Sequence, residues 1–165
     1  MKLSTRARYA LRMMVVFARN SNGDRAVVSL NEVAKEANVS RRYLEQLVIG
    51  LKNAALIRGK SGKGGGYLLA KPANEIPIRQ IVESAIGPIN IVECVGHPEG
   101  CIKADFCECR VLYDLVNRKI TSVMDSLMLS DLADDKRLKQ AVELLDAEPA
   151  TSGGNPCQEN STGKS

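Results

Sequence analysis

Apolar side chains recur every three to four positions in the first 55 residues, the spacing of helices that bury one face. Residues 4–19 predict a first helix, with Ser4 as its N-cap and a polar turn cluster at 20–24 that ends it. Residues 26–28 are expected to form a short strand or an extended link. The chain therefore opens with one long helix before a change of direction.

Two shorter helices are expected next, close together. Ser29 caps the first of them, and Glu32 three residues later completes a capping box. Ser40 caps the second after a short turn at residues 38–39, without a box. The buried face of that second helix is predicted to consist of Leu44, Leu47, Val48, Leu51 and Ala55. Two helices joined by such a turn form a helix-turn-helix.

The pattern changes at residue 56 to two short strands around a glycine-rich turn. Residues 56–60 and 67–70 predict the strands, and residues 61–66 predict the turn. A glycine loop that binds a nucleotide runs from a strand into a helix and is followed by Lys-Ser or Lys-Thr, and neither condition is met. Two strands with a glycine tip directly after a helix-turn-helix are typical of a winged helix.

The rear half predicts helices separated by a loop. Weak periodicity, with glycine and proline, indicates a loop at 93–106. The helices are expected at 78–86, ending at Gly87-Pro88, at 107–129 and at 136–145. The 107–129 helix carries a longer apolar stripe than a domain this small can cover. We therefore expect this stripe to contact a second copy of the chain.

These patterns predict a mainly α fold with a small β wing. Three units are expected: a winged helix-turn-helix DNA-binding domain at 1–75, a cysteine loop with dimerisation helices at 76–146, and a disordered tail at 147–165. With 44% hydrophobic and 25% charged residues, the composition is that of a globular protein. The sequence has no run of 18 apolar residues and no apolar leader, so we expect a cytoplasmic protein.

Charge is unevenly distributed and suggests a nucleic acid as partner. Residues 1–75 carry 14 Lys and Arg against 5 Asp and Glu, whereas residues 76–165 carry 9 against 14. Charge alone fits a chance clustering on the surface equally well. The helix-turn-helix and the wing decide the matter in favour of DNA.

The candidate DNA contacts lie on two elements. The N-terminal end of a helix in the major groove faces the base edges, and the wing approaches the backbone. Arg can bind guanine, Gln can bind adenine, Ser and Tyr can reach phosphates, and lysines attract phosphates. An ordinary solvated helix face is the alternative. The candidates are Ser40, Arg41, Arg42, Tyr43 and Gln46 on the helix, and Lys60 and Lys63 on the wing.

Four of the five cysteines lie within 16 residues, at positions 94, 101, 107 and 109. In a reducing compartment such a cluster indicates metal or redox chemistry rather than structural disulfides. The spacing differs from zinc and ferredoxin motifs, yet three thiolates on a loop can converge on one iron–sulfur cluster. A set of free thiols is the alternative, and spacing alone does not identify the metal.

Several segments resemble the Rrf family of bacterial transcription regulators, which includes IscR and NsrR. They are Met1–Thr5 with Tyr9–Arg12, Ser40–Leu47 and Gly62–Leu69, within a match over roughly residues 1–130. The resemblance implies a homodimer that binds double-stranded DNA at a pseudo-palindromic operator and holds a 2Fe–2S cluster. The family cysteines map onto Cys94, Cys101 and Cys107, with one extra residue between the first two. In related sequences the position of Glu45 is implicated in discriminating between operators.

The fourth cluster ligand is where the chain departs from the family pattern. One branch has a histidine three residues after the last cysteine, and this chain has Arg110 there. Another branch uses an acidic residue of the first helix, and this chain has Arg8 there. His97 and Cys109 remain as candidates. On a helix that includes residue 107, Cys109 would point about 200° away from the thiol at 107.

Three alternatives remain open. Cysteine oxidation or zinc binding could switch DNA affinity without a cluster. The chain could be a thiol- or metal-handling protein that does not act on DNA, or a regulator controlled by docking onto a metabolic enzyme. No C-x-x-C motif and no catalytic cysteine–histidine pairing is visible, so we expect no enzyme activity.

Overall fold

Residues 3–21, 27–100 and 107–147 are described by the computed structural model of the chain. In chain order the elements are α1 (Thr5–Arg19), α2 (Leu30–Ala37), α3 (Arg41–Asn53), β1 (Ile57–Lys60), β2 (Gly66–Leu69), the 3-10 helix η1 (Ala73–Glu75), α4 (Ile78–Ile86), α5 (Glu93–Gly96), the 3-10 helix η2 (Pro98–Gly100), α6 (Glu108–Ser126), α7 (Leu129–Ala133) and α8 (Asp135–Ala147). A mostly helical fold with one small antiparallel sheet confirms the predicted winged helix.

Local hydrogen bonds set the starts of the first three helices, as the sequence predicts. Ser4 Oγ accepts a backbone N–H of the first turn of α1. Ser29 and Glu32 form both halves of the capping box on α2, and Ser40 Oγ accepts a backbone N–H of α3. Each of these bonds spans only three residues, so the sequence pattern was sufficient to locate them.

α1 is the centre of the hydrophobic core. α2, α3, α4 and α7 all pack against it. Met13, Met14 and Phe17 are therefore fully buried, although the sequence predicted a single apolar stripe on this helix. Leu3, which precedes the helix, is exposed.

The wing is the hairpin of β1 and β2. The strands are antiparallel, with Ile57 opposite Leu69. Val28 and Tyr67 exchange two backbone hydrogen bonds of 2.8 and 2.9 Å, so Val28 is extended and ties the base of the wing to the chain before α2. A Cβ at Gly66 would lie 2.5 Å from the carbonyl oxygen of Val28, so this pairing requires glycine there.

α4 has the bounds that the sequence predicts and packs against both α1 and α3. Its residues Ile81 and Val82 are fully buried in the core that α1 organises. Leu129, at the start of α7, is buried in the same core. The unit boundary expected at residue 75 stays a prediction, and the core contains side chains from both sides of it.

The helix predicted for 107–129 ends earlier than expected. Leu127 has extended backbone, and its carbonyl accepts the N–H of Ile78 at 2.9 Å. The N–H of Leu129 donates to the carbonyl of Ile76 at 2.8 Å. This pairing ends α6 and brings Leu129 into the core. Segments so far apart in the sequence leave no trace of their pairing in helical periodicity.

The prediction of an irregular loop at 93–106 is wrong for its described part. Residues 93–100 form two short helical turns, α5 and η2, closed by local bonds such as that from the N–H of His97 to the carbonyl of Glu93 at 2.9 Å. Residues 101–106 and the tail from residue 148 lie outside the described residues. The last helix, predicted at 136–145, is α8 and extends further at both ends.

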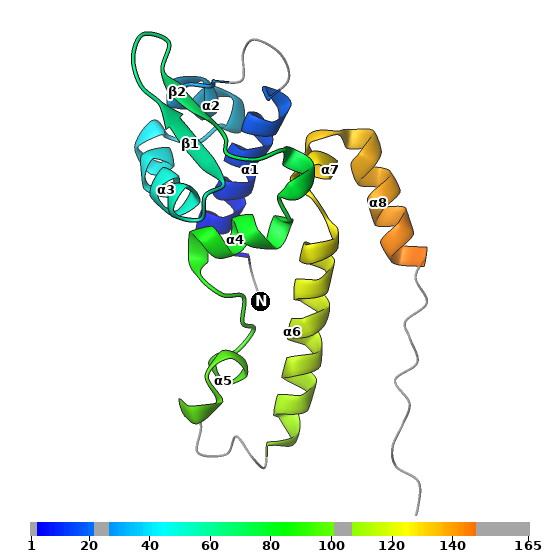
Figure 1. Ribbon diagram of the computed structural model, residues 1–165. Helices are drawn as coiled ribbons and strands as arrows, with labels where there is room; N and C mark the ends of the chain where they lie inside the picture. Colours follow the sequence, from blue (N-terminus) through cyan, green and yellow to red (C-terminus); the bar gives the residue numbers. More distant parts are fainter. Residues whose placement is uncertain (1–2, 22–26, 101–106, 148–165) are drawn as a thin grey trace, which may run out of the picture.

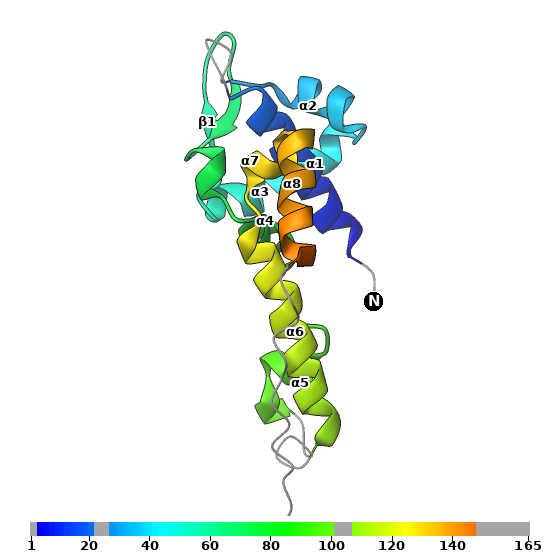
Figure 2. The same cartoon turned by 90° about the vertical axis from the view of Figure 1, so that its right-hand side faces the viewer.

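α6 projects away from the winged helix, as the two views show (Figures 1 and 2). α5 lies beside the first half of α6, far from the wing. Two functional regions were predicted: the winged helix, and the stretch that contains Cys94, Cys107 and Cys109, called here the cysteine segment. They therefore lie at opposite ends of α6. In the described part of the chain, no helix is long and apolar enough to cross a membrane.

Candidate nucleic-acid interface and cysteine segment

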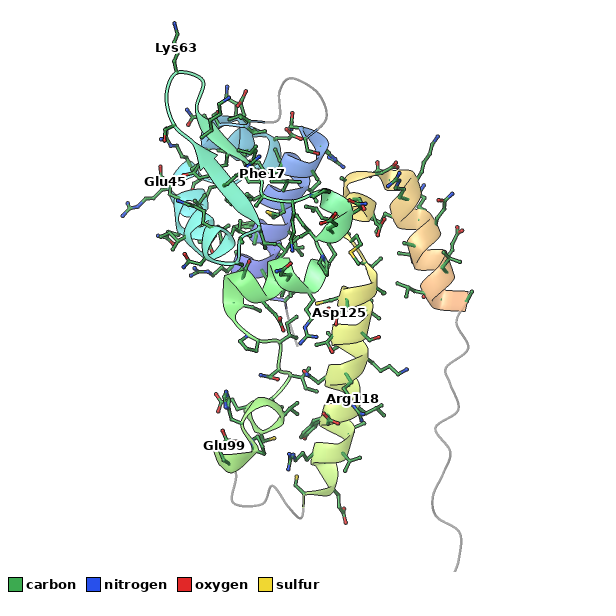
Figure 3. The ribbon with its side chains drawn as sticks, in the orientation of Figure 1. Phe17, Glu45, Lys63, Glu99, Arg118 and Asp125 are labelled. Atoms are coloured by element: carbon green, nitrogen blue, oxygen red, sulfur yellow. The ribbon has the colours of Figure 1, made fainter. Side chains whose placement is uncertain are left out.

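α3 presents a polar face to solvent. Four of its apolar residues are buried against α1, α2 and α4, which orients the opposite face outward: Leu44, Leu47, Val48 and Leu51. Arg42, Glu45 and Gln46 are exposed on this outward part of the helix, and Ser40 is exposed at its start. Figure 3 shows Glu45 on α3, in the upper part of the molecule that also carries the wing.

Arg41 is engaged by two neighbours on the protein. Its Nε lies 3.1 Å from Oε1 of Glu45, one turn along α3, and its Nη1 donates to Oδ1 of Asn31 at 3.1 Å. A guanine edge would compete with Glu45 and Asn31 for this guanidinium. The pairing couples the position of the Arg41 side chain to that of Glu45.

Tyr43, which the sequence suggested as a phosphate contact, packs its ring on the protein. It is half-buried, and it meets the ring of Tyr9 edge to face, with centroids 5.4 Å apart and planes at 88°. The guanidinium of Arg12 lies 5.7 Å from the centroid of the Tyr9 ring. These contacts join the start of α3 to α1, so the Tyr43 ring holds α3 in place.

The wing lysines are exposed. Lys60 ends β1, and Lys63 lies at the tip between Gly62 and Gly64, which have φ of 97° and 77°. Positive φ is readily adopted only by glycine, so these two positions shape the tip. Figure 3 shows Lys63 pointing away from the body of the molecule.

The described cysteines lie at the other end of α6. Cys94 is half-buried on α5, and Cys107 is half-buried at the N-cap position of α6. Cys109 is exposed in the first turn of that helix, and none of the three is in a disulfide. Because Cys107 precedes the helix with extended backbone, the predicted angle of about 200° to Cys109 does not apply. Cys101 and Cys157 lie outside the described residues.

His97 sits between the described cysteines in the sequence and pairs with a carboxylate. The side chain is 76% exposed, and its Nδ1 lies 3.3 Å from Oε1 of Glu99. The backbone N–H of Glu99, together with His97, holds the pKa of the Glu99 carboxyl below its usual value. Over the described residues, no group of three or more His, Cys, Asp or Glu side chains is arranged to hold a metal ion. Figure 3 shows Glu99 far from the wing.

Two backbone bonds attach the segment before α5 to neighbouring helices. The N–H of Ile91 donates to Oδ1 of Asn117 on α6 at 3.1 Å. The N–H of Ile89 donates to Oε1 of Glu83 on α4 at 3.3 Å. The segment that leads into α5 is thereby hydrogen-bonded to both α4 and α6.

Arg79 completes this connection between α4 and α6. Its Nε lies 3.0 Å from Oε1 of Glu83, and its Nη1 lies 3.0 Å from Oδ2 of Asp125. The hydrogen bonds to Glu83 and then Asp125 raise the pKa of the guanidinium above its ordinary value. The network is partly exposed, so its contribution to stability is modest, but it fixes how the two helices meet.

Sequence reasoning missed two features of exposure. On α3, Ile49 is 62% exposed, although Val48 beside it in the sequence is buried. On α6, the apolar stripe is exposed as expected; it includes Val116, whereas Ile120 is half-buried. The exposed large apolar residues of α6 are Val111, Leu112, Leu115, Val116 and Val123. A helical wheel drawn from the sequence could have identified these exposed residues, because they lie opposite the buried positions of their helices.

Comparisons with known proteins agree with this arrangement. The family model Rrf2, described as an iron-dependent transcriptional regulator, matches residues 3–135. The transcriptional regulator IscR of Pectobacterium carotovorum is 30% identical over 159 residues, which cover 96% of this chain and 95% of that protein. The structure of CymR, the global cysteine regulator of B. subtilis, has a TM-score of 0.68 and 34% identity, covering 81% of this chain and 96% of CymR.

Two further solved structures share the fold. IscR of T. potens has a TM-score of 0.65 and 29% identity, covering 87% of this chain and 90% of that one. The oxidized form of CymR from Staphylococcus aureus has a TM-score of 0.64 and 34% identity, covering 81% and 97%. IscR and CymR of B. subtilis are described as regulators, and none of the names denotes an enzyme.

Proposed function

The chain belongs to the Rrf2 family of transcriptional regulators, and from that premise we propose a homodimer whose operator affinity depends on a 2Fe–2S cluster held by Cys94, Cys101 and Cys107. One observation carries the proposal. The half-buried thiols of Cys94 and Cys107 lie on α5 and at the start of α6, two elements that pack together, and the segment that leads into α5 is hydrogen-bonded to both α4 and α6. Family membership also argues against a thiol-handling protein that does not act on DNA.

The outward face of α3 and the wing support the DNA-binding part. Arg42 and Gln46 are exposed on α3, and Lys60 and Lys63 are exposed on the wing. Together with Ser40 and Arg41 they suit contacts with base edges and phosphates in adjacent grooves. The exposed apolar stripe of α6 suits a second copy of the chain, and a twofold dimer matches a pseudo-palindromic operator.

The donor chemistry fits the proposed cluster. Thiolates are the usual ligands of iron–sulfur clusters, and Cys94 and Cys107 are not in a disulfide. An iron–sulfur cluster supplies a centre that gains or loses an electron, or is lost, when conditions change. Cys101 falls between them in the sequence, within a segment outside the described residues.

We assign the fourth ligand to His97 in preference to Cys109. A histidine that ligates a metal commonly donates its other ring N–H to a carboxylate. The pairing of His97 Nδ1 with Glu99 is of this kind and leaves the lone pair of Nε2 for the metal. Cys109 is exposed within the first turn of α6, whereas His97 lies on the segment that carries Cys94.

The link between cluster and DNA affinity runs through α4. The segment before α5 is bonded to Glu83 on α4, and Arg79 joins Glu83 to Asp125 on α6. α4 in turn packs against α3. A shift of the cysteine segment therefore changes the contacts of the helix that supports α3, which would alter how the two copies of α3 meet a DNA duplex.

Spectroscopy on protein purified without oxygen tests the proposal. We expect visible absorption bands with about two irons and two acid-labile sulfides per chain. Cys94→Ser, Cys101→Ser and Cys107→Ser should each abolish the bands. Cys109→Ser is the matched control and should retain them. His97→Ala should keep the iron but change the electron paramagnetic resonance spectrum of the reduced protein.

DNA affinity measured at one fixed salt concentration tests the regulatory part. We expect the cluster-loaded and cluster-free forms to differ in operator affinity by about tenfold or more. Equal affinities would show that the cluster does not regulate DNA binding. A protein without iron and sulfide, even after reconstitution, would contradict the cluster itself and leave DNA binding intact.

A thiol switch is the second candidate, favoured by the similarity to CymR, one structure of which is an oxidized form. Cys109 is exposed two residues after Cys107, where an oxidant can reach it. This candidate predicts a colourless protein whose DNA affinity changes when it is treated with hydrogen peroxide. Cys109→Ser would remove that response, and a metal assay on the same sample separates zinc from thiol chemistry.

A further inference from the structure

Ile49 occupies an unusual place on α3. Among the described residues of this helix it is the large apolar side chain that remains exposed, at 62%. At about 100° per residue it lies roughly 200° from the buried residues Leu47 and Leu51. It is therefore directed away from the core. Packing within the described part of the chain does not account for an apolar side chain at this position.

The neighbours of Ile49 on this face are polar and are the candidate base contacts. Ile49 falls about 20° around the helix from Arg42 and about 60° from Gln46. Both of these side chains are exposed. Single exposed apolar residues are common on protein surfaces. What distinguishes Ile49 is that it lies one turn beyond Gln46 on the same exposed face, at the edge of the surface proposed to enter the major groove.

We propose that Ile49 contacts the C5-methyl group of a thymine and so helps to determine the operator sequence. Thymine is the base that presents a methyl group in the major groove, and apolar side chains recognise it there. Ile49 follows Gln46 by three residues, about 4.5 Å along the helix axis, close to one base-pair step of about 3.4 Å. The thymine therefore belongs to a base pair next to the one that Gln46 contacts. This inference rests on the proposed DNA binding.

The experiment compares thymine with deoxyuridine, which differs only by the methyl group. Operator sequences are first selected from random duplex DNA with the full-length protein, purified without oxygen. Each thymine of the selected half-site is then replaced by deoxyuridine in both half-sites, and affinities are measured by fluorescence anisotropy at one salt concentration. The proteins compared are the unaltered chain, Ile49→Ala, and Leu144→Ala, which truncates a side chain of α8 that is 72% exposed.

At one thymine position we expect the loss of the methyl group to weaken binding by about fourfold per half-site, for the unaltered protein and for Leu144→Ala. Ile49→Ala should bind the thymine duplex more weakly than the unaltered protein by the same factor. Deoxyuridine at that position should change the affinity of Ile49→Ala by less than about twofold. Alanine is a better helix former than isoleucine, so the variant should retain its thermal stability.

Two results would overturn this assignment while leaving DNA binding in place. One is that deoxyuridine lowers the affinity of the unaltered protein and of Ile49→Ala by the same factor at every thymine position. The other is a selected half-site with no thymine whose methyl group matters. Failure to select any sequence would instead contradict the proposed function.

Discussion

Gly50 of α3 lies directly against the backbone oxygen of Ser84 on α4, and a Cβ at position 50 would overlap that oxygen. The two helices therefore approach more closely than any other residue at position 50 would permit. α4 is also the helix that Arg79 and Glu83 connect to α6 and to the segment before α5. The position of α3 thus depends on α4 through a contact that cannot yield by a change of side-chain rotamer.

Replacing Gly50 with alanine should force α3 and α4 apart. We expect the free energy of unfolding to fall by about 1–3 kcal/mol, the usual cost of overpacking, despite the better helix propensity of alanine. Denaturant unfolding measures this change. Gly59→Ala is the matched control because a Cβ there would meet the Tyr67 ring at an ordinary 3.7 Å. Equal stability of the two variants would show that the helices can adjust without cost.

Asn117→Ala should loosen the segment that leads to α5. The Ile91 N–H would lose its acceptor on α6, so its amide hydrogen should exchange about tenfold faster. Hydrogen exchange followed by NMR measures this rate. Asn117→Asp retains an oxygen at the same position and should preserve the protection. Unchanged exchange in Asn117→Ala would mean that this bond does not hold the segment.

Leu112→Glu should disrupt the proposed homodimer. Leu112 is exposed on the apolar stripe of α6, and a carboxylate placed in an interface would be buried without a partner. We expect the dimer dissociation constant to rise by about tenfold or more, as measured by sedimentation equilibrium. Leu144→Glu, on the exposed side of α8, should leave it unchanged. A dimer that tolerates Leu112→Glu would place the interface elsewhere.

The start of α8 should depend on pH. Asp134 accepts the backbone N–H groups of Lys136 and Arg137 at 2.9 and 3.3 Å, which lowers the pKa of its carboxyl. Because the pKa is lowered in the folded state, the ionised carboxylate stabilises the helix fully at pH values above the ordinary pKa of about 4. This stabilisation is lost as the pH falls through the lowered pKa. An NMR titration of the Asp134 carboxyl should show its midpoint below the ordinary value.

Asp134→Asn provides the control for that titration. Asparagine is a comparable N-cap but does not ionise in this range. The amides of Lys136 and Arg137 should then keep the same protection through acid pH. An Asp134 midpoint at or above the ordinary value would show that the carboxylate does not cap α8.

Much of the fold and part of the site were predictable because they depend on short-range interactions. The caps at Ser4, Ser29 and Ser40 each join residues three apart, and the bounds of α4 follow from helical spacing between proline and glycine. The glycine tip that carries Lys63 was equally visible. The polar face of α3 followed from the positions of its buried residues.

Contacts between distant segments were not predictable in this way. The early end of α6 depends on pairing of residues 127–129, which follow it, with residues 76–78, and the base of the wing depends on the pairing of Val28 with Tyr67. The hydrogen bond from Arg41 to Asn31 likewise depends on how α2 and α3 meet. No local pattern records these partners.

The sequence by itself therefore determined the order of elements, the winged helix, the basic face and the cysteine segment, because caps, turns and apolar periodicity act over a few residues. Only the tertiary structure decided that Gly50 meets Ser84 and that Arg79 joins α4 to α6. Those relations depend on the close packing of helices whose neighbours are far apart in the chain, and packing is a property of the whole fold.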